Sequence, residues 1–250
     1  MYLKHLTWQE TEDYLKQRQS IIMPIGSHEQ HGPNGMIGTD IICPARVAES
    51  VSEQTGLLIG PSIEVGMAQH HLAFAGSITV RPSTLISLIQ DYVNSLARHG
   101  FTKFLFLNGH GGNIATVQAA FSEIHAEASL GRAPAGQPEL ELSLHNWYLG
   151  KRVGKLSGEL FPGIEGHHAT PSEISLTYYA FPEHAKSVGL MEPRVAPFGS
   201  FGSASDYRRK FPDGRIGSDP SGATAELGER LCAASAADTI ERLESLGFLA

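Results

Sequence analysis

The chain has 250 residues, of which 41% are hydrophobic and 18% are charged, a composition typical of a globular protein rather than a disordered or fibrous one. The net charge of −7, without any basic run, argues against nucleic acid as a partner. No apolar stretch is long enough to cross a bilayer, and residues 1–10 contain no apolar signal core, so we expect a cytoplasmic protein without membrane contact. Cys43 and Cys232 lie in no CxxC pattern, which indicates neither a disulfide framework nor a thiolate zinc site.

The first part of the chain predicts a helix followed by a buried strand. Thr7 and Glu10 have the spacing of a capping box and open a short amphipathic helix that ends near Gln17. The apolar run 21–25 then predicts a strand that stops at Gly26.

Helices and apolar runs continue to alternate beyond this strand. Pro44, as a first-turn residue, opens a helix to about Gln54, and residues 57–63 form a second apolar run. Thr84 can cap a helix of regular apolar period that Gly100 ends.

Two more predicted strands, residues 101–107 and 140–144, enclose a helix capped by Asn113 and ended by the Gly/Pro-rich residues 131–138. Continuously apolar strands that alternate with helices are typical of a parallel sheet covered on both faces. We therefore predict an α/β fold, with residues 1–250 forming a single domain.

The last third of the chain is less regular. Residues 187–220 are rich in Gly, Pro, Ser and Arg and predict a loop, a lid or a subunit contact. An Ala-rich stretch from about Ala223 to Leu246 predicts a final helix.

Side chains able to bind a metal follow the first predicted strand. Glu29 and His31 are two residues apart on extended or turn backbone, so they point the same way. Asp40 lies nine residues beyond His31, and the intervening glycines permit the chain to fold back. Carboxylate and imidazole ligands together suit Zn²⁺, Mn²⁺ or Fe²⁺.

A second polar cluster, residues 108–113, lies where a strand meets a helix, the place where open parallel sheets gather their functional residues. His110 is a candidate ligand, and Gly111 and Gly112 let a substrate approach the backbone. Two further clusters are residues 166–173, in which Glu173 lies in the first turn of a helix begun by Pro171, and the His-rich residues 69–77.

Each of these residues alone has a structural explanation. A single histidine is more often a hydrogen-bonding residue than a ligand, and Glu173 alone can stabilise a helix N-terminus. The glycines alone can mark a tight turn, and the 108–113 motif lacks the Lys-Ser/Thr ending of a P-loop. Their joint occurrence at three strand ends is the stronger signal. We assign no site role to His5, His99, His125 and His184.

Several of these motifs together resemble the creatininase (creatinine amidohydrolase) family. They are PIGSHEQHGPNGMIGTD, NGHGGN, the His-Ala-x-x-x-Glu-x-Ser element at 168–175, and IGSDPSGATAELGERL near the C-terminus, in the family's order. The resemblance implies a compact α/β subunit, assembly into homohexamers, and a site with two divalent metal ions, Zn²⁺, Mn²⁺ or Fe²⁺.

The resemblance also implies roles for individual residues. One ion would be held by Glu29, Asp40 and His110, and the other by His31, Asp40 and Glu173, so that Asp40 bridges the two. His168 matches a family histidine near the reacting amide, and Ser77 matches a small hydroxyl residue close to the substrate. We expect a remaining set of residues to line the pocket or support the ligands: His70, His71, Asn108, Gly111 and Gly112.

Two departures concern the substrate. Gly111 and Gly112 stand where creatininase has a Tyr-Glu pair, and Ile164 stands where it has a tryptophan that closes over creatinine. The expected activity is hydrolysis of a C–N bond in a small amide, cyclic amide or formamide, by a hydroxide that bridges the metals, with His168 passing a proton to the leaving nitrogen. The alternatives are a lactone or cyclic-ketone hydrolase on the same metals, and a non-catalytic nucleotide- or phosphate-binding module that uses residues 108–113 as an anion nest.

Overall fold

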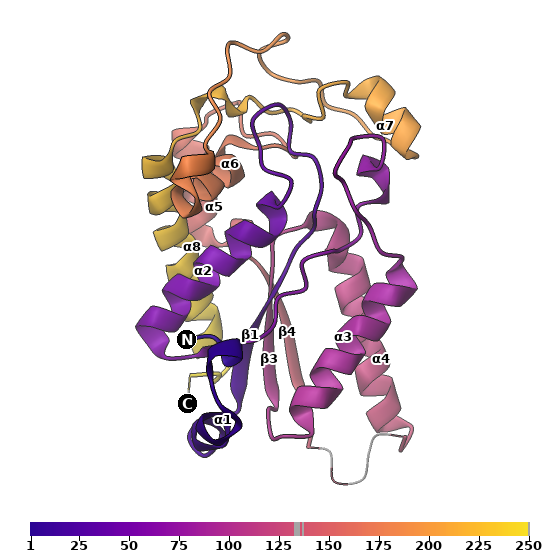
Figure 1. Ribbon diagram of the computed structural model, residues 1–250, viewed down its shortest axis with the longest axis vertical. Helices are drawn as coiled ribbons and strands as arrows, with labels where there is room; N and C mark the ends of the chain where they lie inside the picture. Colours follow the sequence, from indigo (N-terminus) through magenta and orange to yellow (C-terminus); the bar gives the residue numbers. More distant parts are fainter. Residues whose placement is uncertain (133–135, 137, 250) are drawn as a thin grey trace.

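Four parallel strands form the sheet at the centre of the molecule (Figure 1). The computed structural model describes residues 1–132, 136 and 138–249. The strands are β1 (Ser20–Ile25), β2 (Leu58–Ile59), β3 (Lys103–Asn108) and β4 (Glu141–Asn146), in the order β2-β1-β3-β4. In the register of the central pair, Ile22 lies opposite Leu105. The all-parallel pairing confirms the predicted α/β class.

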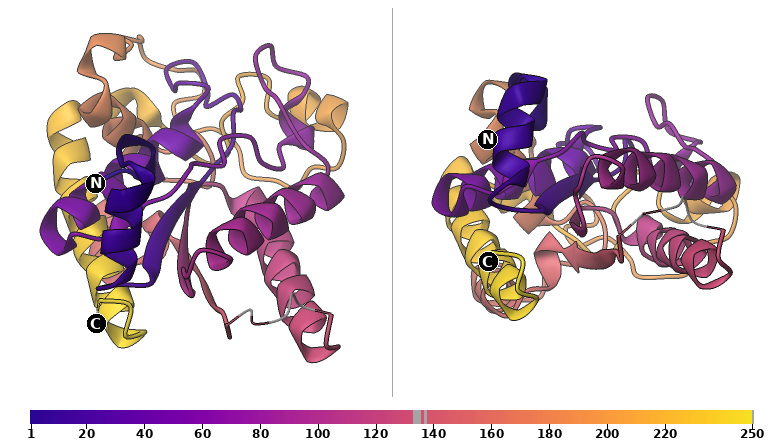
Figure 2. Two further views of the ribbon diagram at one scale, coloured as in Figure 1. Left: turned by 60° about the horizontal axis from the view of Figure 1, so that its bottom comes forward. Right: turned by 90° about the horizontal axis from the view of Figure 1, so that it is seen from below.

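Helices cover both faces of this sheet (Figures 1 and 2). One face carries α2 (Thr39–Thr55), α5 (Lys151–Leu160), α6 (Pro171–Ala180) and α8 (Ala225–Ser245). The other face carries α3 (Pro82–Ala97) and α4 (Ile114–Ser129), while α1 (Trp8–Leu15) lies near the amino ends of the strands and α7 (Ala204–Lys210) near their carboxyl ends.

Alternate strand residues pack into two separate hydrophobic cores. Ile22 is buried against the α2 and α8 side, whereas its neighbour Ile21 is buried with the α3 and α4 side. This period of two follows from the pleat of the strands, and the wholly apolar β1 sequence follows from burial on both faces.

Most predicted elements are present. The capping box of Thr7 and Glu10 begins α1 as predicted, and Thr170 and Glu173 form a second capping box at the start of α6. Asn113 precedes α4, but its side chain does not cap that helix; its amide donates to the Gly26 carbonyl instead.

The starts of two helices were predicted wrongly. Helix α2 begins at Thr39, not at Pro44, which lies inside the helix. Helix α3 begins at Pro82, with Arg81 rather than Thr84 at its N-cap, because proline at the first position already has a helical φ.

Three further expectations need correction. The run 57–63 gives only the two-residue strand β2, because the Gly60-Pro61 pair interrupts the ladder before Ile63 makes an isolated bridge to Ile25. The helix α5 was not predicted, and residues 187–220 include the short helix α7. The predicted end of the fourth helix in residues 131–138 falls partly outside the described residues, and α4 itself ends at Ser129.

The strand order creates a cleft at one edge of the sheet. The chain leaves β1 for β2 on one side and reaches β3 on the other, so the carboxyl ends of β1 and β3 flank a switch point, where α/β proteins bind their ligands. Across the described ranges 1–132, 136 and 138–249, no helix combines the length and the apolarity needed to cross a bilayer.

Candidate metal centre

Five expected ligand residues converge at this switch point. Glu29 and His31 lie in the loop after β1, and His110 lies just after β3. Asp40 is in the first turn of α2, and Glu173 is in the first turn of α6. All five are buried or nearly so, although they come from four separate parts of the chain.

The start of α2 approaches the two strand ends very closely. Pro44 has no N–H, so the carbonyl of Asp40 lacks the usual helical hydrogen bond from the residue four positions on. Gly26 and Gly109 pass directly against it; a Cβ at these positions would lie 2.3 and 1.9 Å from the Asp40 carbonyl oxygen. Only glycine permits this contact, which brings the Asp40 side chain between β1 and β3.

Asp40 lies between two imidazole rings. Its Oδ1 is 3.1 Å from Nε2 of His31, and its Oδ2 is 3.0 Å from Nδ1 of His110. Glu173 Oε2 is 3.8 Å from His31 Nε2, and Glu29 Oε2 is 3.4 Å from His110 Nε2. One carboxylate therefore faces two imidazoles, with a second carboxylate beside each.

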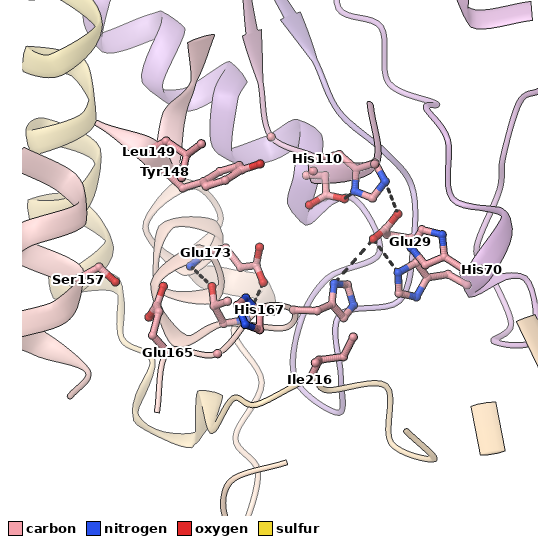
Figure 3. Close-up of a pocket in the computed structure, with 18 of the residues that line it drawn as sticks. Glu29, His70, His110, Tyr148, Leu149, Ser157, Glu165, His167, Glu173 and Ile216 are labelled. Atoms are coloured by element: carbon pink, nitrogen blue, oxygen red, sulfur yellow. Dashed lines mark hydrogen bonds and ion pairs between the residues drawn. The ribbon is translucent and has the colours of Figure 1, made fainter. Parts of the chain in front are cut away.

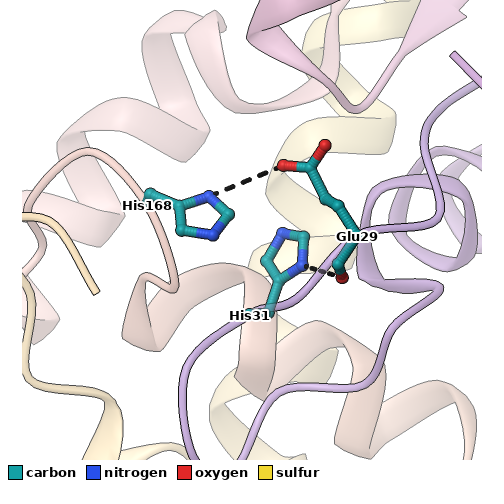
Figure 4. Close-up of side chains that lie close together, drawn as sticks. All are labelled: Glu29, His31 and His168. Atoms are coloured by element: carbon teal, nitrogen blue, oxygen red, sulfur yellow. Dashed lines mark hydrogen bonds and ion pairs between the residues drawn. The ribbon is translucent and has the colours of Figure 1, made fainter. Parts of the chain in front are cut away.

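Backbone carbonyls fix the ring orientation of three histidines, because a carbonyl only accepts hydrogen bonds. His31 Nδ1 donates to the Glu29 carbonyl at 3.1 Å (Figure 4), so Nε2 is the nitrogen that faces Asp40. His110 Nε2 donates to the Met67 carbonyl at 2.8 Å, which leaves Nδ1 toward Asp40. A second nitrogen bound to a carbonyl is the usual environment of a metal-ligating histidine.

A backbone carbonyl also fixes the ring orientation of His168. Its Nε2 donates to the Gln30 carbonyl at 2.8 Å, and its Nδ1 lies 3.8 Å from Glu29 Oε1 (Figure 4). The Ser218 hydroxyl donates to the His168 carbonyl at 2.7 Å and ties it to the segment before α8. The unprotonated Nδ1 therefore points into the site.

The amide of Gln30 orients His71. Gln30 Nε2 lies 3.0 Å from the Gly214 carbonyl and 3.0 Å from Nδ1 of His71. If the amide donates to both, His71 carries its proton on Nε2, which lies 3.1 Å from Glu29 Oε1. His71 then donates to Glu29 and orients this carboxylate rather than acting as a ligand.

The pKa values reflect this crowding of charges. Burial alone would lower the pKa values of His31 and His110, but the surrounding carboxylates outweigh it and raise them to about 10 and about 9. Burial raises the pKa of Glu173 to about 7, whereas the two imidazoles hold the pKa of Asp40 far below its usual range despite burial.

The pKa values of the neighbouring histidines are lowered rather than raised. Burial, together with His31 and His71, lowers the pKa of His168 well below its usual value. Burial lowers the pKa of His70 to about 4 and that of His71 to about 3. These rings are neutral near pH 7.

The donor set fits divalent cations. Glu29 Oε1 and Asp40 Oδ2 are buried without a hydrogen-bond partner among the described residues, which is costly for carboxylates unless a cation compensates them. Within the described part of the chain, three groups of residues have ligand atoms within 4.8 Å of one another. One is His31, Asp40 and Glu173, a predicted ligand set; the others are Glu29, His70 and His110, and Glu29, His31 and His168.

All residues of these groups except His31 line a cavity of about 620 Å³ (Figure 3). Its lining includes His70, His71, Gly111 and Gly112, which were expected pocket residues, and His168, the expected catalytic residue. Ser77 and Asn108 do not line it. The Ser77 hydroxyl accepts from the Gln30 backbone N–H at 3.1 Å, and Asn108 is fully buried and holds the His110 backbone.

Other lining residues were not singled out in the sequence. They include Tyr148, Ser157 and Glu165 at one side and Phe201 and Tyr207 at the other. The aromatic pair comes from residues 187–220, whose composition predicted a loop but no particular contact. Glu165 carries a usable signal, since it directly precedes the polar cluster 166–173 that contains His168.

Residues 4–243 match the creatinine amidohydrolase (Creatininase) family. The match spans nearly the whole chain, so this protein belongs to the creatininase family, whose members are amidohydrolases. The resemblance inferred from the motifs is confirmed.

Curated relatives carry different activities. A mycofactocin precursor peptide peptidase of Mycobacterium ulcerans is 30% identical over 238 residues, which cover 90% of this chain and 84% of that protein. A 3-dehydro-scyllo-inosose hydrolase of Thermotoga maritima is 32% identical over 149 residues, which cover 59% of this chain. This chain thus spans only 45% of the length of the inosose hydrolase.

Solved creatininases share the fold. One described as "Creatininase Mn" superposes with a TM-score of 0.86 at 22% identity and covers 98% of this chain and 97% of its own. A mutant creatininase of "Zn-Zn type" gives a TM-score of 0.85 at the same identity and coverage. At this identity the likeness establishes the fold alone.

Proposed function

We propose that this protein is a metal-dependent hydrolase that cleaves the C–N bond of a small amide, cyclic amide or formamide. The supporting observation is the position of Asp40, whose two oxygens face one imidazole each while a backbone carbonyl holds the other nitrogen of each ring. A carboxylate in this arrangement can bridge two cations.

The residues would divide into two ligand sets around Asp40, of which His31, Asp40 and Glu173 have ligand atoms within 4.8 Å of one another. Glu29, Asp40 and His110 would hold one divalent ion, and His31, Asp40 and Glu173 would hold the other. Zn²⁺, Mn²⁺ or Fe²⁺ ions bound there would supply a bridging hydroxide as nucleophile and polarise the carbonyl of the substrate.

His168 would transfer a proton from the attacking hydroxide to the leaving nitrogen. Its Nδ1 faces the site, and its lowered pKa keeps this nitrogen free to take up a proton near neutral pH. It would then pass this proton to the leaving nitrogen, while the hydrogen bond from Nε2 to Gln30 prevents the ring from turning. His70, His71, Gly111 and Gly112 would shape the space around the substrate.

A second candidate is hydrolysis next to a ketone or lactone carbonyl on the same metals. The relationship to the inosose hydrolase favours it, and the ligand set is compatible with either bond. The phosphate-binding alternative lacks such support, because no Lys or Arg is among the cavity-lining residues of the part of the chain that the structure describes.

The experiment is metal analysis combined with a substrate panel. Asp40→Asn removes the bridging charge, so we expect it to lose bound metal and to lose more activity than the roughly 10–100-fold that an outer partner costs. Asp91→Asn, at an exposed site on α3, is the matched control. Retained metal and full activity in Asp40→Asn would refute the proposal; a panel of amides, formamides and lactones separates the two candidate reactions.

The remaining expectations extend this proposal. Residues 1–250 would act as one domain, assemble into hexamers as the family resemblance implies, and work in the cytoplasm on a small molecule. Sedimentation velocity of the purified protein measures the assembly directly.

A further inference from the structure

The cavity has two ends of different character. We call the part around Glu29, Asp40 and His110 the metal end; Figure 3 shows Ser157 and Glu165 on the opposite side, which we call the far end. Tyr148 and Leu149 also line the cavity.

The far end has room for part of a ligand. Helix α5 contributes Gly154, Ser157 and Gly158 to the cavity wall. A Cβ placed on Gly154 or Gly158 would have no atom within 4 Å, so there is open space beside α5 at both positions. Ile164, which replaces the tryptophan expected in creatininase, adjoins Glu165 in the sequence and is half-buried against the core on the α8 side.

The charges of the cavity are unbalanced. Its lining includes the carboxylates of Glu29, Asp40, Glu173 and Glu165, and no Lys or Arg among the described residues. Two divalent ions with one hydroxide would carry a net positive charge. The carboxylates of Glu29, Asp40 and Glu173 would neutralise this charge. The charge of Glu165 would then have no counterpart.

One oxygen of Glu165 also lacks a hydrogen-bond donor. The Ser172 hydroxyl donates to its Oε1, but its Oε2 is buried without a partner within residues 1–132, 136 and 138–249. Burial raises the pKa of Glu165, and hydrogen-bonding groups of Ser172, Ser157 and Thr170 oppose this rise. A carboxylate in this position is stabilised by a cation or an N–H group that a ligand brings.

We propose that Glu165 binds a cationic group of the substrate, so that the substrate class is a small amide with an ammonium, guanidinium or amidinium group remote from the scissile bond. The proposal rests on the proposed function, because it assumes that the reacting carbonyl lies at the metal end. It also implies that substrates with a carboxylate tail are rejected, since no cation among the described residues lines the far end to receive one.

The test uses hydroxamates, whose head group binds divalent metals, on protein loaded with Zn²⁺ or Mn²⁺. Three compounds share a four-carbon chain and differ in the tail: 4-aminobutanohydroxamic acid, the 4-hydroxy analogue and the succinic monohydroxamate. Calorimetry should give the tightest binding for the ammonium tail, by about tenfold over the hydroxyl tail, which is the scale of one charge-assisted hydrogen bond. The carboxylate tail should bind most weakly.

Substitutions test whether Glu165 causes the preference for the ammonium tail. Glu165→Gln should remove most of the preference for the ammonium tail and Glu165→Lys should favour the carboxylate tail. Glu159→Gln, at an exposed position of helix α5, should keep the wild-type order. If the Glu165 variants do not fold, Gly158→Leu fills the far end from a helix position with open space and should weaken binding of all three compounds.

The possible failures are distinguishable. If none of the three hydroxamates binds to the metal-loaded protein, the proposed metal centre is wrong. If all three bind with equal affinity, or Glu165→Gln keeps the ammonium preference, the metal centre stands and the role of Glu165 is refuted.

Discussion

The metal end and the far end of the cavity are built by different physical means. At the metal end, carboxylates and imidazoles are buried, and backbone carbonyls hold the outward nitrogens of the rings. At the far end, two glycines leave the surface of α5 open, and Leu149 beside them is 66% exposed. From this difference we expect the reaction to depend on a rigid part of the fold, and the choice of substrate to depend on a wall of the cavity that tolerates substitutions.

The largest expected effect concerns His168. His168→Asn keeps a polar side chain but removes the nitrogen that takes up the proton, so kcat should fall roughly 10²–10⁴-fold. Bound metal, measured by elemental analysis, should stay at the wild-type level, because His168 is not one of the five proposed ligands. His184→Asn, at an exposed site, is the control; a large loss of metal in His168→Asn would instead make His168 a ligand.

A smaller effect is expected at Gln30, which is not a proposed ligand but whose amide nitrogen lies 3.0 Å from His71 Nδ1 and 2.9 Å from His168 Nε2. Gln30→Met removes the amide that lies against His71 Nδ1 and the Gly214 carbonyl. Glu29 would lose its oriented partner, so we expect a roughly 10–100-fold loss of metal affinity or activity. Gln30→Glu should shift the pH profile of kcat as well, since it places a negative charge beside both rings. A change in thermal stability alone would mean that Gln30 has only a structural role.

The two ends also differ in how far the sequence predicted them. The ligand residues follow strands or begin helices, so apolar periodicity alone predicted that Glu29, His31 and His110 lie at one edge of the sheet. Their grouping into two ligand sets came from the family resemblance. The position of Asp40 also depends on the contact of its carbonyl with Gly26 and Gly109, which no local pattern reveals.

The far end was largely invisible in the sequence. Helix α5 contains Gly154 and Gly158, which weaken the helix signal of its sequence. At the N-terminus of α5, the backbone N–H groups of Arg152 and Val153 donate to the buried carboxylate of Asp238 from α8. Such a cap between distant segments is a tertiary interaction. Propensity and spacing within one stretch of chain therefore could not locate this wall of the cavity.

The response to pH separates the metal-free from the loaded protein. The pKa values of His31, about 10, and His110, about 9, exceed the usual value for histidine, so the folded metal-free protein binds these protons more tightly than the unfolded chain. Their contribution to stability is complete below the unfolded pKa and is lost as pH rises through about 9 to about 10. The Tm of metal-free protein should therefore fall between pH 7 and 10.

Metal binding removes this dependence, because the ligand nitrogens are then unprotonated. Differential scanning calorimetry should show a flatter Tm profile for the loaded protein over the same range. Titration with Zn²⁺ at pH 8, in buffers of different ionisation enthalpy, should show proton release. Metal binding without proton release would contradict the assignment of His31 and His110 as ligands.

The same substitution, glycine to alanine, should act in opposite directions at the two ends. At Gly26 the new Cβ would lie 2.3 Å from the Asp40 carbonyl oxygen, so Gly26→Ala should destabilise the protein by about 1–3 kcal/mol, the usual cost of overpacking, and displace Asp40. At Gly154 the Cβ meets open space in the middle of α5, so Gly154→Ala should stabilise it by about 1 kcal/mol through helix propensity. Urea unfolding of both variants at one pH measures the contrast. Equal destabilisation would show that the wall of the far end is as tightly packed as the metal end, and the division between a rigid reaction centre and a permissive specificity wall would no longer hold.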